Sequence, residues 1–185
     1  RHAAVMEAAI AAGATIVNDV TALTGDARSL DVVVESGVSL VLMHMQGMPE
    51  TMQQNPQYDD VVGEVMAHLD AQVSTCEARG VVRSEIAIDP GIGFGKTIEH
   101  NLALLKSLEA FQSLGCPLVL GVSRKSMIAR LSKGEEPKDR VAGSVAAALA
   151  GISRGADIIR VHDVAETCQA IAVWQAIENA DTKSK

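Results

Sequence analysis

Aromatic side chains are scarce in this 185-residue sequence, at 2% in all, although 48% of its residues are hydrophobic. A core built from this chain must therefore be aliphatic, filled by Val, Ile, Leu, Ala and Met. The β-branched residues of that set suit strands buried in a parallel sheet. The composition is that of a globular chain and excludes a disordered one, and the length predicts a single domain.

Cysteines are also few, and the three present lie far apart with no Cys-x-x-Cys pair: Cys76, Cys116 and Cys168. This spacing argues against disulfides and against a zinc site, and it favours a reducing, cytoplasmic compartment. Long apolar runs and a signal peptide are missing, so we expect no membrane partner. The formal net charge of −7 argues against nucleic acid as a partner, but it is compatible with a small anion held by local cations.

One pattern repeats along the chain: a helical stretch, a glycine, and a short apolar run that ends in polar residues. We expect helices over residues 3–12, 27–35, 60–78, 100–113, 139–153 and 165–179, and strands over 14–17, 39–42, 85–88, 117–120 and 157–159. The glycines suit the left-handed residue that ends a helix. The apolar runs do not alternate, which predicts strands buried on both faces. Strands alternating with helices predict an α/β fold with parallel strands.

Every predicted strand ends in side chains able to do chemistry: Asn18, His44, Asp89, Ser123 with Lys125, and Arg160 with His162. In a (β/α)8 TIM barrel all strand ends meet at one face, which carries the active site, whereas an open sheet gathers ligands mainly at one switch point. Chemistry at all five ends therefore favours a truncated barrel. It would occupy residues 1–180, followed by a polar tail over 181–185.

The first motif is the glycine-rich segment from Asp89 to Lys96. Its three glycines let the backbone approach a ligand closely. The Asp89 carboxylate, at a strand end, can accept two parallel hydrogen bonds from an amidine-like or guanidine-like edge. A plain turn capped by Asp89 is the structural alternative. No dinucleotide-binding or P-loop glycine motif follows any predicted strand.

Two further motifs are cationic. Between Gly121 and Met127, Lys125 and Ser126 stand where a short helix begins, and free N–H groups there suit a carboxylate or phosphate. Arg160 and His162 lie on the same side of a strand and make an anion clamp. The structural alternatives are a helix cap at Ser126, a rim ion pair at the neighbouring Arg124, and an arginine ion-paired inside the barrel.

The two remaining motifs are polar and sulfur-rich. Asn18 offers a donor and an acceptor, as recognition of a heterocycle requires, although a turn residue is the alternative. Four of the seven methionines lie between Met43 and Met52, where soft side chains suit a flat ligand or fill a core. His44 has no second ligand at a metal-binding spacing, so we interpret it as a hydrogen-bonded rim histidine.

Together and in this order, the five motifs resemble the dihydropteroate synthases over about residues 1–177. The resemblance implies a transferase of folate biosynthesis and a target of sulfonamides. Such an enzyme condenses 6-hydroxymethyl-7,8-dihydropterin pyrophosphate with p-aminobenzoate, giving 7,8-dihydropteroate and pyrophosphate. It also implies that Asp89 and Asn18 bind the pterin ring, that Lys125 reaches the ring carbonyl and nitrogen, and that Met43 packs on the ring.

The same resemblance implies roles at the other end of the site. Arg160 and His162 would hold the leaving pyrophosphate, and with Lys125 they are the catalytic candidates. Phe94 and Lys125 would flank the aminobenzoate ring, and Ser126 would lie near its carboxylate. Gly121 and Ser123 complete the substrate-binding set.

The resemblance also implies parts that this sequence lacks. The family's magnesium ligand and two mobile loops have no counterpart here, so Mg²⁺ is an expected cofactor without a ligand in this chain. The first residue, Arg1, begins inside a helical pattern, and we expect a fragment with barrel strands four to eight. We expect the full-length enzyme to be a homodimer, and this chain alone to be poorly stable and inactive.

Two other functions stay open. One is a pterin-binding methyltransferase barrel that moves a methyl group from methyltetrahydrofolate to a corrinoid. It would share an aspartate and an asparagine for the pterin but would need no pyrophosphate clamp. The other is an inactive chain that only binds a pterin.

Overall fold

The computed structural model describes residues 1–180, an α/β fold whose strands pair in parallel. Strands β1 (Ile16–Asp19), β2 (Ser39–Met43) and β3 (Ile86–Asp89) form one sheet in that order, and β4 (Val119–Leu120) pairs with β5 (Ile158–Ile159). A parallel bridge between Ile88 and Leu118 connects the two sheets. The five strands therefore lie side by side in chain order. The predicted polar tail, 181–185, lies outside the described residues.

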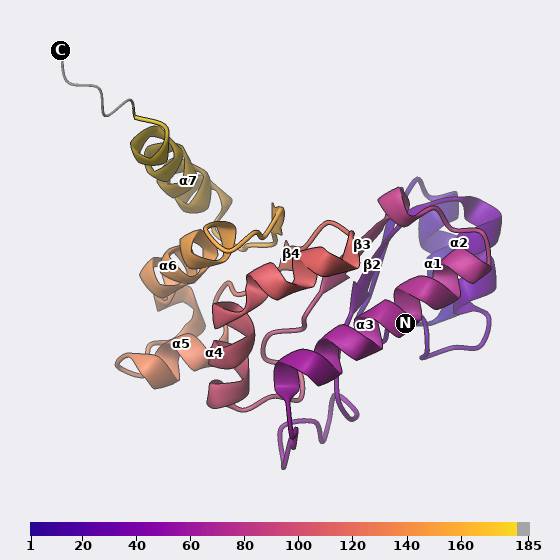
Figure 1. The fold of residues 1–185 in the computed structure, drawn as a ribbon, viewed down its shortest axis with the longest axis horizontal. Coiled ribbons are helices and arrows are strands. Elements are labelled where there is room, and N and C mark those ends of the chain that lie inside the picture. The colour runs from indigo at the N-terminus through magenta and orange to yellow at the C-terminus, as the bar shows by residue number, and fades with distance from the viewer. Residues whose placement is uncertain (181–185) are drawn as a thin grey trace.

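Helices lie before and after every strand. They are α1 (Ala3–Ala11), α2 (Ser29–Ser36), α3 (Val61–Ala78), α4 (Ile98–Lys106), α5 (Ser126–Leu131), α6 (Val141–Ile152) and α7 (Val164–Glu178), with 3₁₀ turns η1 (Arg83–Glu85), η2 (Leu108–Leu114) and η3 (Pro137–Asp139). These units follow one another along the molecule, from α1 and α2 at one end to α7 at the other (Figure 1). Among residues 1–180, no helix combines the length and the apolar character needed to cross a membrane.

The predicted helices and strands are all present, with ends shifted by one or two residues except in one case. The helix predicted over 100–113 is wrong in its second half, because α4 ends early and the chain tightens into η2. Leu108, Phe111 and Leu114 are the buried residues of η2. Their spacing of three matches the three residues per turn of a 3₁₀ helix, which explains the change.

Helix α3 carries the longest buried stripe. Val65, Leu69 and Val73 recur every fourth residue and are fully buried, and the helix packs against β2, α4 and η2. Asp60 begins the helix by accepting hydrogen bonds from the backbone N–H groups of Val62 and Gly63, at 3.2 and 3.1 Å. The buried core is mainly aliphatic, as the composition predicts, and also contains Phe111, Cys76 and Cys116.

The prediction that all strands are buried on both faces is wrong for the two outer ones. Every residue of β3 and β4 is buried, but Ile16 in β1 is 59% exposed and Ile158 in β5 is 48% exposed. Within the described residues, β1 pairs only with β2, and β5 only with β4. The face opposite the helices is therefore open at both ends of the row of strands.

The loops that follow β2 and β3 touch through their backbones. A Cβ atom added at Gly91 would collide with the carbonyl oxygen of His44, and one at Gly95 with that of Gln46. Both glycines also have left-handed φ angles, +70° and +61°. Only glycine fits at these two positions, and the close approach fixes the two loops against each other.

Replacing Gly91 by alanine should therefore destabilise the chain more than replacing Gly80. Gly80 also has a left-handed φ, +93°, but faces open space, so Gly80→Ala reports backbone strain alone. We expect Gly91→Ala to lower the free energy of unfolding by about 2 kcal/mol more than this control, because overpacking adds to the strain. Urea unfolding followed by circular dichroism measures both, and equal losses would contradict the backbone contact.

Candidate functional site

The carboxyl ends of the five strands surround a cavity of about 670 Å³. It is lined by Asn18, Val20, Met43, Asp89, Ile92, Phe94, Gly121, Ser123, Arg124, Lys125, Pro137, Arg160 and His162. Every site residue predicted from the sequence, except Ser126, is in this set. Parallel pairing explains the gathering, because all five strands present their carboxyl ends at the same edge.

Asp89 ends β3 and is 7% exposed. Its Oδ1 accepts a hydrogen bond from the Gly91 amide at 2.7 Å. Burial raises the pKa of Asp89 to about 6, while the Gly91 amide and the charges of Lys125, Lys96 and Arg160 act in the opposite direction. No hydrogen bond within residues 1–180 uses Oδ2, so that oxygen is available to a ligand in the cavity.

Lys125 is the N-cap residue of α5, and its ammonium lies over the ring of Phe94. The distance from Nζ to the ring centroid is 4.1 Å, which is a cation–π contact. Burial lowers the pKa of Lys125; the Asp89 carboxylate opposes this and Arg160 adds to it. The cation of Lys125 and the flat apolar ring of Phe94 therefore lie next to each other in the cavity.

Ser123 and His162 are joined across the ends of β4 and β5. The Ser123 Oγ accepts from the His162 amide at 3.1 Å and lies 3.0 Å from the ring Nδ1. Arg160, two residues before His162, lines the same cavity and has no ion-pair partner in the described part of the chain. The alternative that Arg160 is a structural arginine in an ion pair is therefore wrong within residues 1–180. Its guanidinium is available to bind an anion.

The neighbouring Arg124 has a structural role. Its Nε donates to Asp163 Oδ2 at 3.1 Å, and its second guanidinium contact with the same carboxylate closes an ion pair. Its backbone N–H donates to Ser144 Oγ at 2.9 Å, and its φ of +58° is unusual for a side chain of this size. Arg124 thus ties the loop after β4 to the loop after β5, as the rim ion-pair alternative held.

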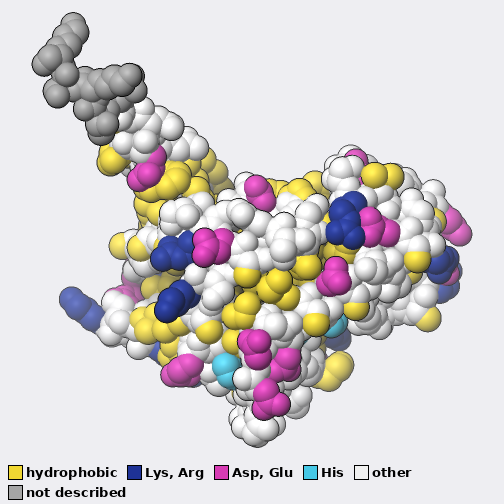
Figure 2. Space-filling model, viewed as in Figure 1, with side chains coloured by type: hydrophobic (Ala, Val, Ile, Leu, Met, Phe, Trp, Pro, Cys, Tyr) yellow, Lys and Arg dark blue, Asp and Glu magenta, His cyan; other side chains and the backbone are white. Residues whose placement is uncertain are grey.

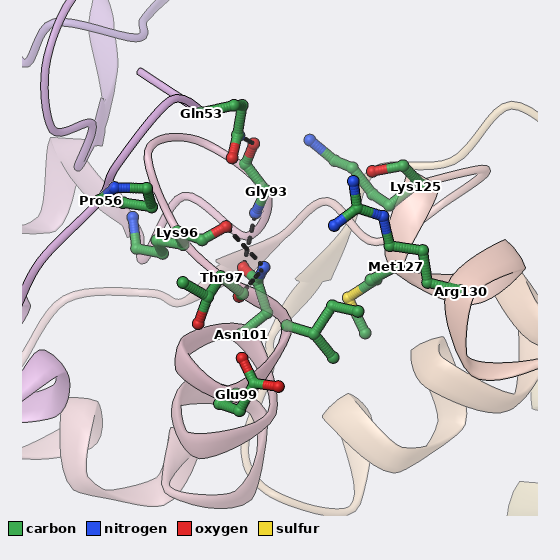
Figure 3. A pocket seen from close by; sticks show the side chains of 12 residues that line it. Gln53, Pro56, Gly93, Lys96, Thr97, Glu99, Asn101, Lys125, Met127 and Arg130 are labelled. Carbon is green, nitrogen blue, oxygen red and sulfur yellow. Dashed lines mark hydrogen bonds between the residues drawn. The ribbon is translucent and has the colours of Figure 1, made fainter. Parts of the chain in front are cut away.

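A second cavity of about 320 Å³ lies beyond Lys125. Figure 3 shows Lys125 and Arg130 on one side of it, with Gly93, Lys96 and Asn101 on the other. Ser126 lines this second cavity and not the main one. It is the first residue of α5, with Lys125 at the N-cap, so the interpretation of Ser126 as a helix cap is wrong.

Three polar residues differ from what the sequence indicated. His44 is hydrogen-bonded as predicted, with Nδ1 2.9 Å from Lys96 Nζ, but it is buried and not on the rim. Burial lowers the pKa of His44 to about 3, so its ring is neutral at physiological pH. Sequence reasoning missed Lys96 and Asn101 as buried polar residues, because nothing in their local pattern distinguishes them from surface positions of a loop and a helix.

Metal binding finds no support among the described residues. They contain no group of three or more His, Cys, Asp or Glu side chains that could hold an ion. The main cavity pairs one carboxylate, Asp89, with the cations of Lys125 and Arg160. Magnesium prefers several oxygen ligands, so the residues present do not fit it.

The family model of the pterin binding enzymes matches residues 1–162. The chain belongs to this family. It is 47% identical over 181 residues to the dihydropteroate synthase of Neisseria meningitidis serogroup B, an alignment that covers 96% of this chain. The chain spans 64% of the length of that relative.

Solved structures of pterin binding enzymes have the same fold. The dihydropteroate synthase of Stenotrophomonas maltophilia superposes with a TM-score of 0.93 at 47% identity, covering 97% of this chain and 68% of that one. The dihydropteroate synthase of Xanthomonas albilineans, solved in complex with 7,8-dihydropteroate, gives a TM-score of 0.89 at 45% identity. That match covers 96% of this chain and 64% of the other.

The buried carboxylate of Asp89 should make the free energy of unfolding depend on pH. Because burial raises the pKa of Asp89 from 3.8 to about 6, the folded chain binds this proton more tightly than the unfolded chain does. The resulting stability is present below about pH 4 and is lost as the pH rises through about 6. Asp89→Asn should therefore stabilise the chain at pH 7, by at most about 3 kcal/mol, and have little effect near pH 4.

Urea unfolding of the wild type and Asp89→Asn at pH 4 and pH 7 measures this difference. Asp139→Asn, at an exposed position, is the control for removing a negative charge. A difference between wild type and Asp89→Asn that stays the same at both pH values would contradict the burial of a charged carboxylate.

Proposed function

We propose that this chain carries the pterin and pyrophosphate sites of a dihydropteroate synthase. That enzyme condenses 6-hydroxymethyl-7,8-dihydropterin pyrophosphate with p-aminobenzoate, giving 7,8-dihydropteroate and pyrophosphate. The observation that carries the proposal is the main cavity itself. One buried carboxylate, Asp89, lines the same cavity as Arg160, which has no ion-pair partner within residues 1–180, and as His162. These groups fit a ligand with a donor-rich heterocycle at one end and an anion at the other.

We propose that the fold is a truncated (β/α)8 barrel holding strands four to eight. Five parallel strands in chain order, with helices between them, support this. So do the unpaired outer edges of β1 and β5 and the exposed Ile16 and Ile158, which further strands would cover. The share of the relatives' length that the chain spans is consistent with the same proposal.

The pterin end of the ligand is assigned to the residues around β1 and β3. The Asp89 carboxylate would accept the two parallel N–H groups of the 2-amino-pyrimidine edge, and Asn18 would pair with a further donor and acceptor of the ring. Lys125 would reach the ring carbonyl and nitrogen, and Met43 would pack on the flat face. All four side chains line the main cavity, with Gly121 leaving room beside Asp89.

The pyrophosphate is assigned to Arg160 and His162, with Ser123 holding the His162 ring by the contact at Nδ1. In the reaction the bond between the pterin methylene carbon and the pyrophosphate oxygen breaks, and the electron pair leaves with the pyrophosphate. The clamp stabilises the charge that develops on that anion. The aniline nitrogen then attacks the electron-poor methylene and loses a proton. No covalent bond to the enzyme forms.

The p-aminobenzoate is assigned to the region around Lys125, which lines both cavities. Phe94 and the Lys125 stem would flank its ring, because both side chains line the main cavity and the Lys125 ammonium lies 4.1 Å from the centre of the Phe94 ring. Its carboxylate would extend toward Ser126 in the second cavity, which Lys125 also lines. Lys125 thereby belongs to both substrate sites.

Three further properties belong to the proposal for the longer enzyme. Any magnesium would take its ligands from outside the residues described, and no step above depends on it. Association as a homodimer is consistent with hydrophobic side chains exposed along α7, namely Val164, Val173 and Ile177, on the part of the molecule that projects in Figure 2. We place the enzyme in the cytoplasm.

The corrinoid methyltransferase alternative is less well supported. Such a barrel would need the pterin residues Asp89 and Asn18, but a methyl donor carries no pyrophosphate. Arg160, which has no ion-pair partner in the described part of the chain, and the Ser123–His162 pair would then have no ligand. The anion clamp therefore favours the synthase.

Two variants should separate the two ends of the ligand. Asp89→Asn should weaken binding of the dihydropterin pyrophosphate and of the 6-hydroxymethyl-dihydropterin without its pyrophosphate, each by at least about tenfold, because a charged hydrogen-bond acceptor is lost. Arg160→Met should weaken only the pyrophosphate form. Isothermal titration calorimetry measures both, with the exposed Lys133→Met as control. If Arg160→Met weakens the binding of both ligands equally, the assignment of the pyrophosphate to Arg160 is contradicted.

The 185-residue chain alone should not catalyse the formation of 7,8-dihydropteroate. The resemblance to the dihydropteroate synthases implies a magnesium ligand and mobile loops without a counterpart in this sequence, so we expect the substrates to be held without the groups that complete the site. An assay for 7,8-dihydropteroate with both substrates and Mg²⁺ tests this, with a full-length relative as the positive control. Turnover near the rate of that control would defeat the prediction.

A further inference from the structure

Lys96 is a buried lysine that the proposed chemistry does not use. It is 3% exposed, and its Nζ is surrounded by acceptors. The ammonium donates to the carbonyl oxygens of Gly91 at 3.1 Å and Phe94 at 3.0 Å, and it lies 2.9 Å from Nδ1 of His44. The His44 carbonyl is a fourth, longer contact at 3.4 Å. Lys96 therefore connects the end of β2 with the glycine-rich loop after β3.

Other hydrogen bonds hold the same loop, including those from the Gly91 amide to Asp89 Oδ1 and from Gln53 Nε2 to the Gly93 carbonyl oxygen. The Gly93 amide donates to Asn101 Oδ1 at 2.7 Å, and Tyr58 donates its hydroxyl to the Gly95 carbonyl at 2.9 Å. The Phe94 amide donates to the Gly91 carbonyl at 3.1 Å, which is the same oxygen that Lys96 contacts. Lys96 thus touches both ends of the turn that carries Phe94 toward Lys125.

Opposing effects act on the charge of Lys96. Burial lowers its pKa to about 7 and Lys125 acts in the same direction, while the Asp89 carboxylate opposes them. The carbonyl oxygens around Nζ can only accept, so they favour the form with three donors. His44 is neutral and accepts at Nδ1, which assigns its ring proton to Nε2.

We propose that Lys96 is a positioning residue with two effects on the pterin site. Its ammonium fixes the glycine-rich loop so that Phe94 lies against Lys125, and its positive charge helps to keep the neighbouring Asp89 ionised. The first effect is a property of the fold, and the second rests on the proposed function, because it acts through pterin binding.

The charged and titratable groups around Asp89 and Lys96 come from four other elements. Asp89 on β3 and Lys96 both bond to Gly91, through its amide and its carbonyl oxygen, and Lys125 before α5 and Arg160 after β5 line the same cavity as Asp89. Lys96 also faces His44 after β2 and His68 on α3, whose pKa values burial and the nearby ammonium both lower. Removing the charge of Lys96 leaves Asp89 with Lys125 and Arg160 as its remaining cations.

Hydrogen exchange of the loop tests the first effect without any ligand. In Lys96→Met, amides of the peptide over residues 89–96 should lose protection by about tenfold, since hydrogen bonds to a charged group are lost. Asn101→Ala should loosen the same peptide, because it frees the Gly93 amide while removing no charge. Lys133→Met should leave it unchanged. Protection in Lys96→Met equal to that in Lys133→Met would overturn the proposal.

Pterin binding as a function of pH tests the second effect. In the wild type, affinity for the dihydropterin pyrophosphate should fall as the pH drops and Asp89 takes up a proton. Without the positive charge of Lys96, Asp89 protonates at a higher pH. The fall should therefore begin about one pH unit higher in Lys96→Met and at the wild-type pH in Asn101→Ala. Equal shifts in both variants would show that loop disorder alone is responsible and would overturn the electrostatic effect.

The outcomes distinguish this inference from the proposed function. If the wild type does not bind the pterin, the proposed function fails, while the exchange measurement still decides whether Lys96 holds the loop. If Lys96→Met does not fold, as judged by helical circular dichroism, wild-type protection factors between pH 6 and 10 replace it. They should fall for the 89–96 peptide as Lys96 loses its proton, and constant protection factors would overturn the proposal.

Discussion

The carboxylate of Asp89 is buried among the ends of the five strands, and burial makes its charged form unfavourable. The groups around it reduce that unfavourable free energy. Burial alone raises its pKa, and the Gly91 amide with three cations counters that effect. Two of those cations, Lys125 and Arg160, are also proposed to bind the substrates. The positive charge that lets Asp89 stay ionised therefore also draws in the pyrophosphate and aminobenzoate anions.

The second constraint is the close contact of two loop backbones. Gly91 and Gly95 allow the loop after β3 to lie against the loop after β2, and Lys96 fills the space beneath with an ammonium that bonds to both. This arrangement places Phe94 against Lys125. Packing that is tight enough to exclude a single methyl group thus determines where an aromatic ring meets a cation in the cavity.

Much of this arrangement is visible in the sequence, because short apolar runs and glycines mark where parallel strands and helices end. Polar residues directly after those runs had to meet at one edge, so the main cavity was predictable. The spacing of Leu108, Phe111 and Leu114 was a readable sign of a 3₁₀ turn that the prediction missed. The burial of Lys96 depends on contacts with segments far away in the chain, such as His44, and single-sequence patterns do not contain that information.

The most direct test is a ¹³C NMR titration of the Asp89 side-chain carboxyl, assigned by its disappearance in Asp89→Asn. In the free chain it should titrate at about pH 6, well above the ordinary value of 3.8. With saturating dihydropterin pyrophosphate it should stay ionised to a much lower pH, since two donors on the ring favour the charged form. A carboxyl that titrates at its ordinary value and does not respond to the ligand would contradict the account.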